Sequence, residues 1–88
     1  MIRRRVIIRG RVQGVFFRAS CADAAQSLGV TGWVSNEPDR TVQAVFEGDE
    51  GAVQAMIAWC HEGPARAIVD DVEVLDEEPA GERGFETR

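Results

Sequence analysis

The chain has 88 residues, of which 44% are hydrophobic and 28% charged, and its formal net charge is −5. This length and composition predict one globular domain spanning residues 1–88 and exclude a disordered chain. The longest apolar run, residues 55–60, is far shorter than the roughly 20 residues that a membrane helix needs, and no secretory leader is recognisable. We therefore expect a cytoplasmic protein.

Few side chains suited to redox, metal or nucleophilic chemistry are present. Cys21 and Cys60 cannot form a disulfide scaffold, the chain has no CxxC motif, and a lone His61 leaves a zinc site without ligands. We interpret both cysteines as small buried residues, which antiparallel helices would make neighbours. The sequence therefore predicts neither a bound metal nor another cofactor.

Positive charge is concentrated near the N-terminus. Six of the ten arginines lie within residues 1–18, which contain no acidic residue. An acidic protein with one basic end repels nucleic-acid phosphates over most of its surface, so we expect no nucleic-acid partner, whereas a small anion at one edge is compatible. We interpret Arg3, Arg5 and Arg9 as the solvated face of a strand, and the acidic stretch Asp70–Glu82 as a second solvated face.

The first half of the chain predicts a strand, a helix and a second strand. An apolar run between arginines indicates a strand over about Arg4–Gly10. From Phe17 to Leu28 apolar residues recur three and four positions apart, which predicts a helix, and Gly29 suits its C-terminal end. A short strand is expected over Thr31–Ser35, followed by turn residues 36–40.

The second half of the chain again predicts a strand, a helix and a strand. Residues Thr41–Glu47 alternate between apolar and polar, which predicts a half-buried strand paired as a hairpin with the preceding one. A helix follows, with Asp49 as its expected N-cap and Gly63 beyond its end. Apolar residues over Val69–Val74 predict a fourth strand, and Phe85–Thr87 suggests a last short one.

This order of strand, helix, strand, strand, helix and strand predicts a ferredoxin-like βαββαβ fold of the α+β class. Right-handed crossovers interleave the two strand–helix–strand units into one antiparallel sheet with both helices on one face. The first two strands then run parallel. Their ends, at Gly10 and Asn36, and the start of the first helix are therefore expected at the same edge of the molecule.

The loop from Gly10 to Arg18 has the composition of an anion site. Glycines allow successive N–H groups to turn toward one point, and a helix terminus adds partial positive charge. Arg18 in the first helical turn is unfavourable for the helix itself, yet its planar guanidinium matches two phosphate oxygens. From spacing alone, a phosphate cradle and a plain strand–helix connection with a solvated arginine both remain open.

Residues Gly10–Arg18 resemble the acylphosphatase signature, Gly-x-Val-Gln-Gly-Val-x-Phe-Arg, and match it at every defined position. Gly32–Asn36 is similar to the second motif of that family, and the resemblance extends over essentially the whole chain. Two positions depart from the family pattern. Ser35 stands where a longer side chain is usual, and Arg40 stands where glycine is usual, so a positive φ there would strain the backbone by about 1 kcal/mol or shift the turn.

The resemblance implies a hydrolase that cleaves acyl phosphates to a carboxylate and inorganic phosphate without a metal. It implies that Asn36 orients the attacking water and that the Arg18 guanidinium holds the phosphoryl oxygens. The main-chain amides implied to bind phosphate are those of Gln13, Gly14, Val15, Phe16, Phe17 and Arg18. Only one of the two adjacent phenylalanines can point inward, which leaves the other for the mouth of the site.

Two other functions fit the same order of elements. A non-catalytic module could hold acyl or carbamoyl phosphate on the same loop. An RNA-recognition domain needs aromatic residues on the open face of its third strand, where this chain has Thr41, Gln43, Val45 and Glu47, so we reject it. We expect a monomeric enzyme whose partner is a small-molecule acyl phosphate.

Overall fold

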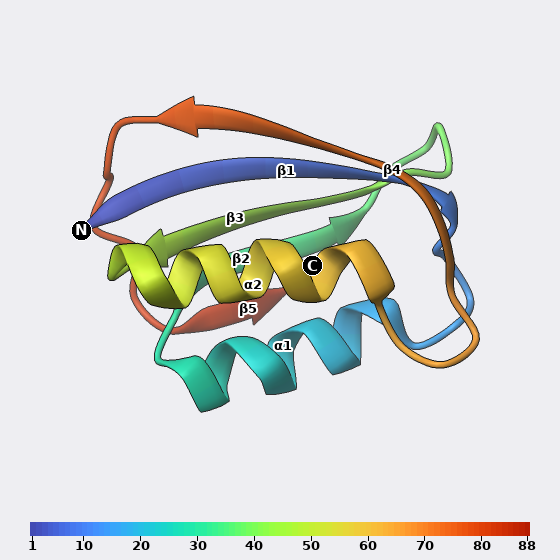
Figure 1. Ribbon diagram of the computed structural model, residues 1–88, viewed down its shortest axis with the longest axis horizontal. Helices are drawn as coiled ribbons and strands as arrows, with labels where there is room; N and C mark the ends of the chain where they lie inside the picture. The colour runs from blue at the N-terminus through green and yellow to red at the C-terminus, as the bar shows by residue number, and fades with distance from the viewer.

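Five strands form one sheet in the computed structural model, which describes residues 1–88. The elements in chain order are β1 (Ile2–Arg11), α1 (Phe17–Leu28), β2 (Thr31–Asn36), β3 (Val42–Gly48), α2 (Glu50–Glu62), β4 (Ile68–Glu77) and β5 (Phe85–Thr87). The strands are ordered β4-β1-β3-β2-β5, and Figure 1 shows both helices on one side of them. The predicted ferredoxin-like architecture is confirmed. Neither helix has the length and apolar character needed to cross a bilayer.

The sheet is mixed, because its last strand runs parallel to its neighbour. β1 pairs antiparallel with β3 and β4, and β2 pairs antiparallel with β3, as predicted. β5 instead pairs parallel with β2, with Val34 opposite Thr87. Residues 78–84 carry the chain from the β4 edge of the sheet to the opposite edge. The prediction of a wholly antiparallel sheet is therefore wrong for β5.

β1 is longer than predicted and contains an irregularity near its end. The register of β1 with β4 shifts between Arg9 and Gly10, and Gly10 has a φ of 131°. A Cβ at this position would collide with the main-chain oxygen of Ile68, so only glycine fits. Beyond this bulge β1 stays paired with β4 through Arg11 but is no longer paired with β3, just before the loop to α1 begins.

The helix boundaries follow the predicted signals, with one difference at α2. Gly29 ends α1 in the left-handed region at a φ of 70°, as predicted. Asp49 occupies the N-cap position of α2, but its side chain makes no capping hydrogen bond. Its main-chain oxygen accepts a hydrogen bond from the N–H of Val53 at 2.9 Å.

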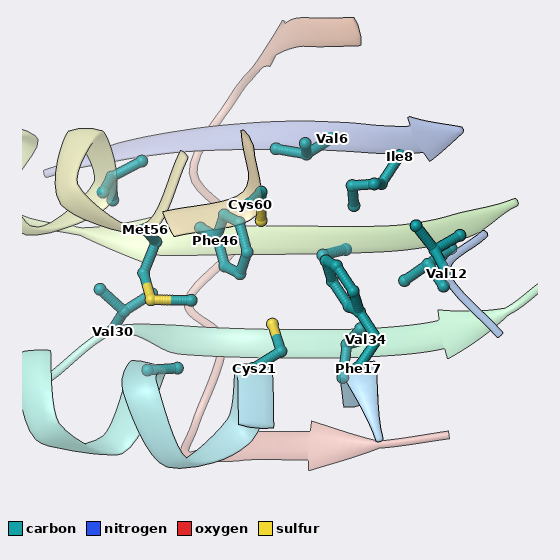
Figure 2. Packing of buried hydrophobic residues seen from close by; sticks show 14 of the residues in the cluster. Val6, Ile8, Val12, Phe17, Cys21, Val30, Val34, Phe46, Met56 and Cys60 are labelled. Carbon is teal, nitrogen blue, oxygen red and sulfur yellow. The ribbon is translucent and has the colours of Figure 1, made fainter. Parts of the chain in front are cut away.

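The hydrophobic core lies between the two helices and the sheet (Figure 2). Phe17 and Phe46 are its largest members, and Phe17 also meets the ring of Trp59 edge-on at 5.2 Å between centroids. Cys21 from α1 and Cys60 from α2 are both free thiols and fully buried. The adjacent Cys21 and the burial raise the pKa of the Cys60 thiol, as expected for an inert core residue.

Ion pairs cover part of the opposite face of the sheet. Arg3 is only 8% exposed and donates hydrogen bonds to Glu47 at 3.2 Å and to Glu77 at 2.8 Å. Arg5 also donates to Glu77, at 2.6 Å. The prediction of a solvated arginine face is therefore right for Arg9, which is exposed, and wrong for Arg3.

Glu47 is the centre of this cluster and is 1% exposed. Its carboxylate accepts hydrogen bonds from the main-chain N–H groups of Ala80 at 2.8 Å, Gly81 at 2.8 Å and Glu82 at 3.0 Å. The prediction that Asp70–Glu82 is a solvated face holds for most of that stretch and is wrong for Glu77 and Glu82, whose half-buried carboxylates pair with Arg3. Glu47 thus holds the connection between β4 and β5 against the sheet, and we call this set of hydrogen bonds the Glu47 clamp.

The donors around Glu47 stabilise its charged form. Hydrogen bonds lower the pKa of the Glu47 carboxyl, although burial opposes them. The largest effect comes from the N–H of Ala80, and smaller ones come from the N–H of Glu82, the Arg3 guanidinium and the N–H of Gly81. A lowered folded-state pKa contributes stability above the unfolded pKa of about 4.3, and that stability is lost as the pH falls through the folded-state pKa. The clamp is therefore intact at neutral pH and weakens in acid.

Replacing Glu47 with glutamine is expected to lower the free energy of unfolding by about 2–3 kcal/mol at pH 7. The NH₂ group of glutamine would stand where a carboxylate oxygen now accepts hydrogen bonds, and it would leave N–H donors without an acceptor. Urea unfolding at pH 7 and pH 4 measures this effect. The loss of stability between the two pH values should be smaller in Glu47→Gln than in the unmodified protein. Glu78→Gln, an exposed glutamate in the same connection, is the matched control. Equal destabilisation by the two variants would contradict the clamp.

Candidate active site

The loop between β1 and α1 lies beside the β2–β3 hairpin, at the right-hand end of the molecule in Figure 1. The side-chain NH₂ group of Gln13 joins them, since it donates to the main-chain oxygens of Glu37 at 2.8 Å and Thr41 at 3.0 Å. The predicted convergence of these segments is confirmed. Gln13 fixes the loop relative to the hairpin that follows Asn36.

The main chain of the loop turns through two left-handed residues. Gly14 has a φ of 74° and Phe16 a φ of 64°. Outside helices and strands, none of the N–H groups of residues 13–18 donates to a main-chain oxygen. The first N–H groups of a helix have no partner within it, so those of Phe17 and Arg18 are free as well. The loop therefore presents a run of uncommitted donors.

The N-terminus of α1 lacks the features that usually neutralise a helix end. Its N-cap residue, Phe16, makes no side-chain capping bond, and the first turn holds no acidic residue. The partial positive charge of the helix end is consequently uncompensated, and Arg18 adds a full charge. A negatively charged group is the complement to this arrangement.

The Arg18 side chain is half-buried and is held by the last residue of the chain. One of its Nη atoms donates to the main-chain oxygen of Arg88 at 2.8 Å. Arg88 is itself anchored, because its N–H donates to Val34 at 2.8 Å and its guanidinium lies 4.5 Å from the ring centroid of Trp33. Arg18 is thus oriented by one hydrogen bond and keeps its other N–H groups for a ligand.

Asn36 ends β2, where the hairpin turn begins. The hydrogen bond at its main-chain oxygen comes from the Ser35 hydroxyl at 3.3 Å, and its side-chain amide has no partner within the chain. Arg40 closes the turn with a φ of 74°, so a side chain stands at the left-handed position expected to favour glycine. The turn nevertheless keeps its internal bonds, with the N–H of Glu37 donating to Thr41 at 2.9 Å.

The carboxylate of Asp39 also stabilises this turn. The hydroxyl of Thr41 donates to Asp39 at 2.7 Å and its N–H donates at 3.1 Å. These bonds lower the pKa of the Asp39 carboxyl, with the hydroxyl as the largest cause. The hairpin that carries Asn36 is therefore closed by the side chains of Gln13 and Asp39 as well as by its main chain.

A cavity of about 370 Å³ opens where these segments meet. Its lining residues are Val12, Gly14, Phe16, Phe17, Arg18, Ala19, Asn36 and Thr87. The guanidinium and the amide predicted to act on substrate thus share one cavity, although they come from different elements. No aspartate, glutamate, histidine, lysine or cysteine lines it, and no cluster of such side chains elsewhere is arranged to hold a metal ion.

Not every predicted binding residue presents its side chain to the cavity. Gln13 uses its side chain to hold the hairpin, and Val15, 8% exposed, belongs to the core. Both can contribute through their main-chain N–H groups alone. Sequence reasoning missed Thr87 and Arg88, because only the parallel pairing of β5 with β2 brings them to the site and no local pattern signals that pairing.

Comparison with known proteins agrees with this geometry. The family model described as acylphosphatase matches residues 4–87. An acylphosphatase of Rubrobacter xylanophilus is 60% identical over 96% of this chain and 77% of its own length. One of Trichormus variabilis is 56% identical over 100% and 87%. The crystal structure of acylphosphatase from Bacillus subtilis superimposes with a TM-score of 0.96 at 32% identity, covering 100% of this chain and 99% of the other. The chain belongs to the acylphosphatase family.

Proposed function

We propose that this protein hydrolyses acyl phosphates to a carboxylate and inorganic phosphate within the cavity that contains Arg18 and Asn36. The enzyme class follows from membership of the family and from relatives at 56–60% identity that carry the name acylphosphatase. The roles of individual residues rest on the geometry of the loop. The observation that carries them is the joint presence of free amides, a guanidinium and an unpaired amide side chain around one cavity.

Binding of the phosphoryl group follows from the donors at the loop. The N–H groups of residues 13–18 take its oxygens, and the Arg18 guanidinium adds a charged, planar pair of donors. In phosphoryl transfer the transition state spreads negative charge over the equatorial oxygens. Donors that are already aimed at those oxygens stabilise that charge without reorganising, which is an effective form of electrostatic catalysis.

The reaction does not need a general acid. When the bond between phosphorus and the acyl oxygen breaks, the electron pair leaves with a carboxylate. Carboxylic acids have a pKa near that of a glutamate side chain, about 4.3, so this leaving group is stable without a proton at neutral pH. This agrees with a cavity that no acidic or imidazole side chain lines.

Asn36 is suited to orient the water rather than to deprotonate it. Its amide oxygen can accept a hydrogen bond from the water and hold it in line with the breaking bond. The phosphoryl oxygens of the substrate take the proton that the water loses. Atoms and charge then balance, with a carboxylate and a protonated phosphate as products.

The decisive experiment is hydrolysis of benzoyl phosphate by the purified protein in the presence of EDTA. We expect a kcat between about 1 and 10³ s⁻¹ and the same rate with and without the chelator. Phosphate release is the measurement, corrected for spontaneous hydrolysis. Inhibition by inorganic phosphate without turnover would identify a binding module instead, and a rate abolished by EDTA would exclude a metal-independent mechanism.

We propose that the protein acts as a cytoplasmic monomer on a small substrate, without nucleic acid. The net charge of −5 disfavours polyanions. β4, an edge strand of the sheet, carries Asp70, Asp71, Glu73 and Asp76. Charges on an edge strand oppose pairing with a second copy.

A further inference from the structure

Phe16 has a backbone conformation that its side chain disfavours. It lies in the left-handed region, with φ 64° and ψ 25°. Residues with a Cβ adopt this region at a cost, and Asn, Asp and Gly account for most of its occupants. Unlike Gly14, which is also left-handed, Phe16 therefore strains the loop because it is not glycine.

Nothing in the protein interior compensates for this strain. The Phe16 side chain is 73% exposed, whereas the neighbouring Phe17 is 2% exposed and packs in the core. Phe16 also occupies the N-cap of α1, where serine, threonine, aspartate or asparagine would stabilise the helix by accepting a hydrogen bond. One residue thus combines backbone strain, an exposed aromatic ring and a lost cap. Such local conflicts concentrate at functional positions.

The Phe16 side chain lines the cavity in which the proposed function places the substrate. Phe16 lines the same cavity as Arg18 and Asn36, and the other apolar lining residues are Val12, Phe17 and Ala19. Among the lining residues Phe16 alone is an exposed large hydrophobic side chain. In the proposed mechanism the main-chain N–H of Phe16 binds the phosphoryl group. The side chain of the same residue is therefore close to the acyl group that is bonded to it.

We propose that the side chain of Phe16 contacts the acyl group and selects acyl phosphates whose acyl group is a flat apolar ring over those with a small one. This inference rests on the proposed function and adds the chemical class of its substrate. Aromatic rings pack edge-to-face or offset against one another and gain more than their buried area alone supplies. The exposed ring has a face available for such a contact.

The test compares kcat/KM for benzoyl phosphate with kcat/KM for acetyl phosphate in several variants at position 16. Phe16→Asn and Phe16→Gly remove the ring and still tolerate the left-handed backbone, so both should fold. Phe16→Trp restores an aromatic surface. Any change that the variants make to the phosphate cradle affects both substrates and cancels in the ratio.

We expect the benzoyl-to-acetyl ratio to fall about 3- to 10-fold in Phe16→Asn and Phe16→Gly, mainly through a higher KM for benzoyl phosphate, and to be retained in Phe16→Trp. Leu28→Asn removes an exposed apolar side chain at the far end of α1 and is the matched control, for which the ratio stays constant. A ratio unchanged in both ring-free variants would overturn the inference, as would a fall in Phe16→Gly alone, which would indicate backbone flexibility. If the unmodified protein hydrolysed neither substrate, the proposed function itself would fail.

Discussion

Replacement of Arg18 with lysine is expected to lower kcat/KM for benzoyl phosphate by about 100- to 1,000-fold. An ammonium group keeps the charge but cannot donate to two phosphoryl oxygens in one plane while also donating to the main-chain oxygen of Arg88, as the guanidinium does at 2.8 Å. Loss of one well-placed donor to a developing oxyanion has an effect of this size in other enzymes. Steady-state kinetics of the purified variant, with circular dichroism to confirm folding, measure it.

Arg66→Lys is the matched control, because Arg66 is exposed and lies in the connection between α2 and β4. Its kinetics should equal those of the unmodified protein. Activity of the Arg18→Lys variant within a factor of two of the unmodified protein would show that the charge alone suffices. The bidentate role assigned to the guanidinium would then be wrong.

Replacement of Asn36 with alanine is expected to lower kcat by about 100-fold while the inhibition constant of inorganic phosphate stays within about twofold. A water that is no longer held in line reacts less often, whereas the loop amides and Arg18 still bind the anion. The two quantities separate the orientation of water from the binding of phosphate. Both come from one set of inhibition experiments with benzoyl phosphate.

Gln54→Ala removes an exposed side-chain amide from α2, far from the hairpin, and controls for a general effect of losing an amide. The prediction for Asn36 assumes that Gln13 and the turn bonds keep the hairpin in place, which an unchanged unfolding free energy would support. If phosphate inhibition weakened in parallel with kcat, Asn36 would be a phosphate ligand rather than the residue that orients water.

The elements of the fold that arise from local patterns were predictable from the sequence. Apolar spacing predicts Phe17 and Cys21 on the buried face of α1, as the structure confirms, although Leu28 at the end of the same pattern is exposed. Glycine signals mark the end of α1 at Gly29 and the turns of the loop before it. These features depend on residues close in sequence, where helix periodicity and backbone sterics act directly.

Features that depend on distant segments were not predictable in this way. Glu47 lies on the polar side of an alternating strand, and the alternation rule assigns such a residue to solvent. Glu47 is covered by residues 80–82, whose main-chain N–H groups donate to its carboxylate. These residues lie in a connection whose sequence has no periodic pattern, so their position could not be predicted. The parallel pairing of β5 escaped prediction for the same reason.

The candidate site divides in the same manner. The loop over residues 10–18 and the arginine at its end are contiguous, so their composition makes an anion cradle one of two open interpretations, and the resemblance to a family favours it and supplies the substrate. The side-chain bonds of Gln13 to the hairpin and the support of Arg18 by Arg88 join segments that are remote in sequence. The pattern of apolar and polar residues predicts neither of these hydrogen-bonded contacts.

The position of β1 inside the sheet has a consequence for how the protein acquires its structure. The first strand of the chain pairs on one side with β3 and on the other with β4, which is completed only at Glu77. Its ladder therefore requires closure of long chain loops, whose entropic cost slows the search for the native topology. During synthesis β1 lacks one of its two neighbouring strands until β4 has left the ribosome. Completion of the sheet is accordingly a late step in the folding of these residues.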